Sequence, residues 1–115
     1  MIQSQRITDA EIERRMGLSS SAIKAVCEQW EIMEMAVFGS IVRSDFRADS
    51  DIDVLLCFAP EAQQGLLTLA RIKHELEAST KKRVDIAIKE SIVNSENPIR
   101  RDEILKTARI IYAQR

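Results

Sequence analysis

The sequence predicts a single small α/β domain, because strand-like and helix-like patterns alternate along it. Three short segments, residues 32–38, 51–58 and 84–88, have the apolar composition of buried strands. Around them, apolar residues recur at the three- and four-residue spacing of amphipathic helices. At 115 residues, the chain has room for one domain and little more.

Composition and charge narrow the classes of protein that fit. The chain is 45% hydrophobic and 30% charged, which is typical of a globular protein. Its formal net charge of -1 gives no overall basic field toward nucleic acid or a membrane surface. No apolar run approaches the ~20 residues that a membrane-spanning helix needs, and the first residues lack a signal peptide's apolar segment. We therefore expect a cytoplasmic protein with no membrane partner.

Two helices are expected at the amino terminus, after a frayed start at residues 1–6. Thr8 as N-cap and Glu11 three residues later make a capping box, and Gly17 ends a helix that runs to about Met16. The pair loosely resembles a helix-turn-helix, but the second helix presents a mixed and fairly acidic face. We therefore expect it to pack rather than to read DNA. The serines at 19–21 can cap this second helix, whose apolar stripe consists of Ile23, Val26, Cys27 and Trp30.

A long helix is expected between the second and third strands. Ala59-Pro60 ends the second strand, because proline interrupts a strand ladder and a helix interior alike. The helix then runs from Gly65 to about Ser79. After the third strand, residues 89–97 have no periodicity and are expected to form a loop or a short irregular turn. The expected buried stripe of the long helix is Leu66, Leu69, Ile72 and Leu76.

A final helix is predicted from Asn97-Pro98, because asparagine is a good N-cap and proline suits the first helical position. It runs to about Thr107 and is expected to turn Ile99, Ile104 and Leu105 inward. Residues 108–112 either continue this helix or form a short extended tail, and the pattern does not distinguish the two.

The cysteines and the single histidine do not predict a zinc site. Cys27 and Cys57 lie in apolar surroundings and are expected to be buried free thiols. His74 lies in a helical stretch, where a solvated surface position is expected.

Three aspartates stand out in the strand segments. Side chains alternate across a strand, so Asp51 and Asp53 point to the same face. Two carboxylates held this close repel one another and raise each other's pKa unless a cation lies between them. Asp85 stands in the apolar third strand and joins them if the two strands are neighbours. Mg²⁺ suits three such oxygen ligands, and the sequence therefore predicts a magnesium site.

The connection before the aspartates is suited to a phosphate group. Gly39 permits a tight turn and close backbone approach, and Ser40 opens what is expected to be a short helix. The hydroxyl of Ser40 and free N–H groups there can bind phosphate oxygens. Arg43 and Arg47 lie in the same connection and either add positive charge to the site or are solvated surface residues.

The order and spacing of these residues resemble a known signature. Gly39-Ser40, ten further residues and then Asp51-Ile52-Asp53 are similar to the GS-x10-DxD signature of the DNA polymerase β-like nucleotidyltransferases, and Asp85 resembles that family's third carboxylate. The short length and the ending resemble the minimal nucleotidyltransferases, the MNT proteins paired with HEPN toxins. The resemblance covers roughly residues 33–113. Ser44 departs from it, because many relatives have glycine there, but the departure removes no ligand.

The resemblance implies a polymerase β-like fold, a small mixed β-sheet with helices packed on it. The nucleotidyltransferase core would be residues 32–113, with a helical extension at residues 1–31. Asp51 and Asp53 would hold two Mg²⁺ ions on ATP, and Asp85 would bind the catalytic ion and help to activate an acceptor hydroxyl. Gly39 and Ser40 would hold the β- and γ-phosphates. The hydroxyl would then attack the α-phosphorus and release pyrophosphate.

The acceptor is expected to come from another molecule, because the chain has no second domain and no basic, aromatic-rich face for a nucleic acid strand. Similar minimal proteins transfer AMP to a tyrosine of a HEPN ribonuclease toxin, or neutralise it by binding. The resemblance thus implies a type VII-like antitoxin with protein adenylyltransferase activity, as a homo-oligomer or in a complex with its toxin. A binding-only antitoxin, an enzyme acting on a small hydroxylated molecule such as an aminoglycoside, and a DNA-binding regulator stay open as alternatives.

Overall fold

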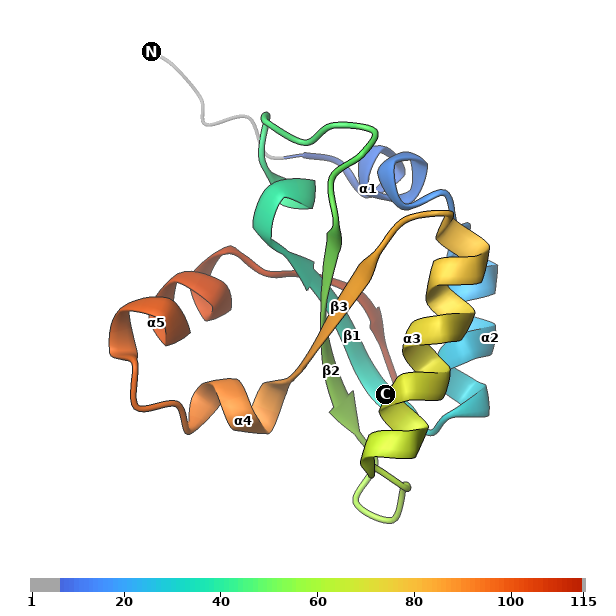
Figure 1. The fold of residues 1–115 in the computed structure, drawn as a ribbon, viewed down its shortest axis with the longest axis vertical. Helices are drawn as coiled ribbons and strands as arrows, with labels where there is room; N and C mark the ends of the chain where they lie inside the picture. Colours follow the sequence, from blue (N-terminus) through green and yellow to red (C-terminus); the bar gives the residue numbers. More distant parts are fainter. Residues whose placement is uncertain (1–6, 115) are drawn as a thin grey trace.

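The chain folds around a four-stranded mixed sheet in a computed structural model that describes residues 7–114 (Figure 1). The strand order is β3-β2-β1-β4. Strand β1 (Ile32–Phe38) pairs antiparallel with β2 (Ile52–Phe58) and with β4 (Arg109–Ala113), while β2 pairs parallel with β3 (Val84–Ile88). The predicted mixed sheet is confirmed. The fraying expected at residues 1–6 lies outside the described residues.

The two amino-terminal helices form as their capping residues predict. Helix α1 (Asp9–Met16) begins at Thr8, whose hydroxyl accepts a hydrogen bond from the N–H of Glu11, and it ends at Gly17 with φ 75°. Helix α2 (Ser20–Gln29) begins at Ser19, whose hydroxyl accepts from the N–H of Ala22. Both helices contribute buried residues to the hydrophobic core, as expected for a packing role.

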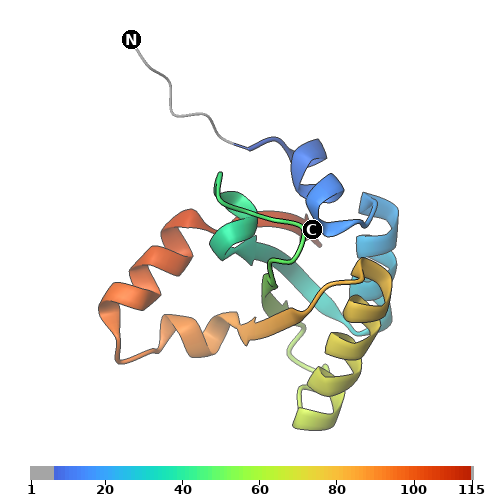
Figure 2. The same ribbon diagram turned by 45° about the horizontal axis from the view of Figure 1, so that its top comes forward.

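The sheet separates a large core from a small one, because side chains alternate across each strand. Helices α1, α2 and α3 (Leu66–Thr80) cover one face, and α4 (Lys89–Val93) and α5 (Pro98–Thr107) lie on the other side (Figures 1 and 2). The small core, under α5, consists of Ala36, Phe38, Leu55 and Ile104. The side chains that are fully buried in the large core include Ile12, Met16, Ile23, Met35, Val37, Ile52, Val54, Leu56, Ile72 and Leu76.

The predicted buried stripes of α3 and α5 include residues that are exposed in the structure. Leu66, the first residue of α3, is 86% exposed, although Ile72 and Leu76 are buried as expected. In α5, Ile104 is buried, whereas Ile99 is 80% exposed and Leu105 is also exposed. Ile104 is thus the one buried residue of α5.

The secondary structure of two segments near the carboxyl terminus depends on tertiary packing, which the sequence pattern does not show. The prediction of a loop over residues 89–97 is wrong in its first half, because α4 follows β3 directly and Ile92 packs against the small core. Asn97 caps α5 through a hydrogen bond from the N–H of Arg100, as predicted. The ending left open between helix and extended tail forms β4 on the free edge of β1.

The burial of the two cysteines and of the histidine is close to what was expected. Cys27 and Cys57 are free, and Cys27 is buried, but Cys57 is only half-buried because it points to the sparsely covered side of β2. Burial and the nearby Glu28 raise the pKa of the Cys27 thiol to about 12. His74 is exposed, as predicted. Over residues 7–114 the structure contains no helix with the length and apolar character to cross a membrane.

Candidate functional site

The turn after β1 brings backbone and carboxylate into direct contact. Gly39 begins a short 3-10 helix, η1 (Gly39–Val42), with φ 77°, in the left-handed region that favours glycine. A Cβ at this position would lie 2.3 Å from Oδ2 of Asp53. The fully buried Ile41 anchors the turn in the large core. The expected short helix is therefore present, and its glycine is required by both backbone and neighbour.

The sheet register places the predicted acidic residues side by side. Phe38, which precedes the turn, is the antiparallel partner of Asp53, and Asp85 is the parallel partner of Asp53 on β3. Asp51 lies just before β2, on the same side as Asp53. Asp51 and Asp53 are half-buried, while Asp85 is exposed on an edge strand.

The pKa of Asp53 is affected by the neighbouring acidic residues. Partial burial is the largest cause that raises the pKa of the Asp53 carboxyl, followed by the negative charges of Asp85 and Asp51. The guanidinium groups of Arg100 and Arg43 act in the opposite direction. Charge repulsion of this kind is relieved when a cation binds between the carboxylates.

The donor set fits Mg²⁺ in its chemistry, because all three side chains offer hard carboxylate oxygens. Within residues 7–114, however, no three His, Cys, Asp or Glu side chains are gathered closely enough to hold a metal ion as they stand. The backbone register nevertheless places Asp85 directly beside Asp53 on the neighbouring strand. The assignment of these aspartates as ligands stays a prediction.

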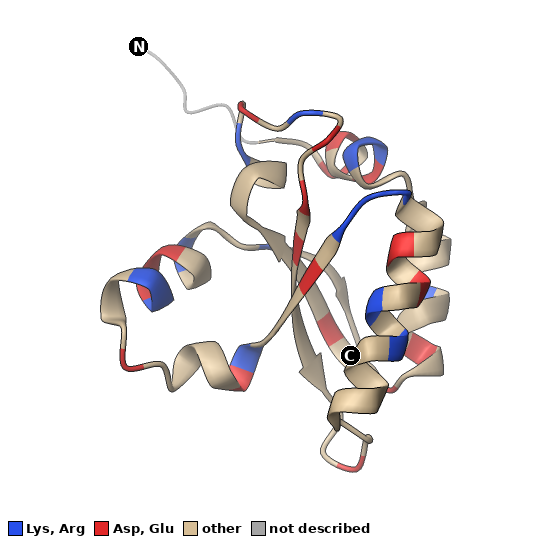
Figure 3. Ribbon diagram, in the orientation of Figure 1, with Lys and Arg blue, Asp and Glu red and all other residues tan. Residues whose placement is uncertain are grey.

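A cleft of about 690 Å³ opens beside this turn. Five of the six predicted site residues line it: Gly39, Ser40, Arg43, Asp51 and Asp53. Asp85 is beside the cleft rather than in its lining, and Arg47 does not line it either. In Figure 3 the red segments at the start of β2 and on β3 lie close together, near the blue stretch that leads into β3. Acidic and basic groups therefore meet at one end of the sheet.

Helix α5 forms a wall of the cleft that the sequence analysis missed. Its contributing residues are Asn97, Ile99, Arg100, Glu103, Ile104 and Thr107. The polar members Arg100, Glu103 and Thr107 recur at three- and four-residue spacing, which marks one helix face and could have been noticed. Arg100 is the most informative of them, because its charge acts on Asp53.

Comparisons with known proteins give a consistent result. Residues 19–111 match the family described as nucleotidyltransferase domain. The protein adenylyltransferase MntA of Thermococcus cleftensis is 38% identical over 69 residues, which cover 60% of this chain and 68% of that protein.

Solved structures share the fold. One assigned as a minimal nucleotidyltransferase has a TM-score of 0.63 at 28% identity, covering 92% of this chain and 98% of that chain. A chain from the complex of a tri-AMPylated Shewanella oneidensis HEPN toxin with an MNT antitoxin has a TM-score of 0.56 at 12% identity, covering 83% of this chain and 70% of that chain. At the latter identity the likeness shows the fold alone.

Proposed function

This chain belongs to the nucleotidyltransferase domain family, and we propose that it is an antitoxin that transfers AMP from ATP to a tyrosine hydroxyl of a HEPN-domain ribonuclease toxin. The observation that carries the proposal is the contact between the Gly39 turn and Asp53, with Asp85 directly beside Asp53. A similar protein is named a protein adenylyltransferase, and a structurally similar antitoxin is bound to an AMPylated HEPN toxin.

The turn and two arginines would bind the triphosphate of ATP, the donor substrate. The bare backbone of Gly39 admits a phosphate group at close range, and Ser40 offers a hydroxyl and an N–H. Arg43 and Arg100 flank the cleft and balance the negative charge of a triphosphate. These four residues would orient the α-phosphorus toward the side where Asp85 lies.

The acidic residues serve the transfer itself. Asp51, Asp53 and Asp85 would hold Mg²⁺, which when bound supplies charge stabilisation at the phosphoryl oxygens. Asp85 would accept the proton of the acceptor hydroxyl, whose oxygen forms the new bond to the α-phosphorus while the bond to the leaving pyrophosphate breaks. Asp85 is exposed on the edge strand β3, so this side is open to a large acceptor. A tyrosine on a protein surface fits that opening.

The test is label transfer from ATP labelled at the α-phosphate, with a HEPN-domain toxin as acceptor and Mg²⁺ present. The wild-type chain should label the toxin, and Asp51→Asn combined with Asp53→Asn should reduce labelling by about a thousandfold or more. Asp49→Asn is the matched control, because Asp49 is an exposed carboxylate in the same loop outside the cleft lining.

Each of the remaining candidate functions predicts a result of its own. A binding-only antitoxin neutralises the toxin with no label on it, and the double variant neutralises equally well. An enzyme acting on a small molecule confers resistance on expression without any partner. A salt-sensitive complex with its own promoter fragment would favour the DNA-binding regulator.

A further inference from the structure

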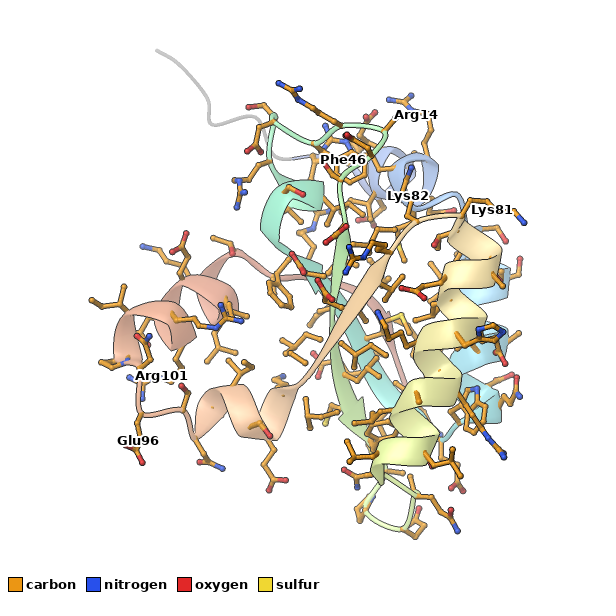
Figure 4. All side chains as sticks on the ribbon, in the orientation of Figure 1. Arg14, Phe46, Lys81, Lys82, Glu96 and Arg101 are labelled. Carbon is orange, nitrogen blue, oxygen red and sulfur yellow. The ribbon has the colours of Figure 1, made fainter. Side chains whose placement is uncertain are left out.

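The loop at residues 43–50, between the phosphate turn and Asp51, holds an aromatic ring that is close to two cations. The guanidinium carbon of Arg15 lies 5.3 Å from the centroid of the Phe46 ring, and Nζ of Lys82 lies 5.9 Å from it. Figure 4 shows Phe46 close to Lys82, where the loop, α1 and the segment before β3 meet. Both distances are in the range of a cation–π interaction.

The same two cations also bind the backbone on either side of the ring. One nitrogen of Arg15, Nη1, donates to the carbonyl oxygens of Ile41 at 2.8 Å and Arg43 at 2.6 Å. Nζ of Lys82 donates to the carbonyl oxygen of Ala48 at 2.9 Å. The carbonyl groups held in this way extend from η1 to the approach of Asp51. The connection is therefore held along its length from outside.

Helix α1 gives Arg15 a rigid support. Its apolar residues Ile12 and Met16 are fully buried, and Arg15 itself is only 19% exposed. At the other end of the helix, Arg109 of β4 pairs with Asp9 at 2.6 Å and also bonds the carbonyl oxygen of Ile7. The sheet, α1 and the loop are thus connected in series.

We propose that Arg15 and Lys82 are positioning residues that clamp the loop at residues 43–50, and so hold Gly39, Ser40 and Asp51 ready for the triphosphate. The inference rests on the proposed function, which supplies the nucleotide. Neither cation lines the cleft, so they act through the loop rather than on the substrate. Helix α1 also precedes residues 19–111, so Arg15 lies outside the segment that matches the family.

The clamp has a kinetic signature that general stabilisation lacks. A loop released from the clamp must be ordered when the nucleotide binds, and that ordering weakens binding. The turn meets the phosphates in the ground state and in the transition state alike, so the KM for ATP should rise while kcat changes little. A purely structural role would instead lower the amount of folded enzyme and leave KM unchanged.

The decisive comparison is Arg15→Ala against Arg14→Ala. Arg14 is the neighbouring arginine, 74% exposed and paired with Glu11. Three quantities are measured: the Kd of Mg·ATP, the KM for ATP in label transfer, and the hydrogen exchange of the amides of Arg43 and Ser50. These two amides bond the carbonyl oxygens of Ser40 and Arg47. Arg15→Ala should raise the Kd and KM about tenfold and speed both exchanges, while Arg14→Ala stays within about twofold of the wild type.

Two milder variants keep the inference falsifiable if Arg15→Ala does not fold. Arg15→Lys keeps the charge but loses the planar fork and should fall between wild type and alanine. Lys82→Met keeps the stem without the charge and should raise the Kd about threefold. Unchanged Kd and exchange in folded variants, or equal changes in Arg14→Ala, would overturn the clamp.

Failure of the clamp and failure of the proposed function are distinguishable. Exchange is measured on the nucleotide-free protein and needs no acceptor, so it judges the clamp by itself. Faster exchange in Arg15→Ala supports the clamp even when no AMP reaches the toxin. Normal AMP transfer by Arg15→Ala with unchanged KM and exchange overturns the clamp and leaves the proposed function standing.

Discussion

Gly39 and Asp53 are in contact across β1 and β2, so that a Cβ at position 39 would lie 2.3 Å from Oδ2 of Asp53. The contact arises because Phe38 and Asp53 are paired in the antiparallel register and the chain turns at once with φ 77°. The phosphate turn and the carboxylate are therefore a single structural unit. A change in either one is expected to disturb the other.

Gly39→Ala tests this unit. The left-handed backbone alone should cost about 1–2 kcal/mol of stability, and the side-chain collision should add to that cost. Displacement of Asp53 by about 1 Å should also lower the transfer rate about a hundredfold. Chemical denaturation and the rate of label transfer are the measurements. Gly65→Ala is the control, because φ there is -72° and no atom of residues 7–114 lies within 4 Å of a new Cβ. Equal losses in both variants would show that the contact with Asp53 is not the cause.

Asp53→Asn should stabilise the metal-free protein while it abolishes transfer. The pKa of Asp53 is raised above its ordinary value of 3.8 by burial and by Asp85 and Asp51, so its ionised form destabilises the fold. That penalty is absent below pH 3.8 and is fully present once the pH exceeds the raised pKa. In EDTA at pH 7 the variant should therefore have the higher Tm.

Addition of Mg²⁺ should give the wild type a higher Tm than Asp53→Asn, the reverse of the order in EDTA. Bound metal stabilises the native wild type by mass action, and Asp53→Asn should gain much less. Thermal unfolding with EDTA and with increasing Mg²⁺ measures both effects. A wild-type Tm that does not respond to Mg²⁺ or Mg·ATP would argue against the carboxylate site.

Arg100→Ala should weaken nucleotide binding. Arg100 lines the cleft and its charge acts on Asp53, but it is exposed, so its removal should raise the Kd of Mg·ATP by no more than about fivefold. Arg101→Ala is the control, because Arg101 pairs with Asp102 and does not line the cleft. Calorimetric titration of both variants separates them, and an unchanged Kd in Arg100→Ala would remove α5 from the nucleotide site.

Glu77→Gln should lower stability in a pH-dependent way. The Glu77 carboxylate accepts from the N–H of Val84 at 2.9 Å and from Nζ of Lys73 at 2.9 Å, and these bonds hold its pKa below the ordinary 4.5. The stabilisation is present above pH 4.5 and is lost as the pH falls through the depressed pKa. The Tm of the variant should therefore be a few degrees lower at pH 7, with the gap closing in acid.

The control for this change is Glu75→Gln, two residues earlier on α3. It removes the same charge from the same helix and should leave the Tm at pH 7 nearly unchanged. A gap between wild type and Glu77→Gln that persists unchanged at the lowest pH would show that the carboxylate charge is not its source.

The first three strands, the helix caps and the site motif could be predicted from the sequence because each depends on local chemistry. Thr8, Ser19 and Asn97 cap helices whatever they pack against, and the spacing from Gly39 to Asp53 is readable directly. The place of α5 could not be predicted in the same way. In a ten-residue helix, Ile99, Ile104 and Leu105 look equally apolar, and only the sheet decides that Ile104 alone is buried.

Contacts between residues far apart in the chain could not be predicted from the sequence either. Arg15 reaches carbonyl groups 26 and 28 residues away, and a backbone acceptor leaves no mark on the sequence. The pairing of Asp53 with Asp85 was expected only on condition that β2 and β3 are neighbours, and the sheet register confirms that condition. What these aspartates bind is a matter for experiment.

Neutralisation of the toxin is expected to be a covalent modification, which the intact mass of the toxin would show. The HEPN toxin is co-expressed with the wild-type chain or with the Asp51→Asn and Asp53→Asn double variant, purified and weighed by mass spectrometry. We predict one or more added AMP groups on a tyrosine with the wild-type chain, and an unmodified, toxic protein with the double variant. A toxin that stays unmodified yet is silenced by both chains would contradict the account.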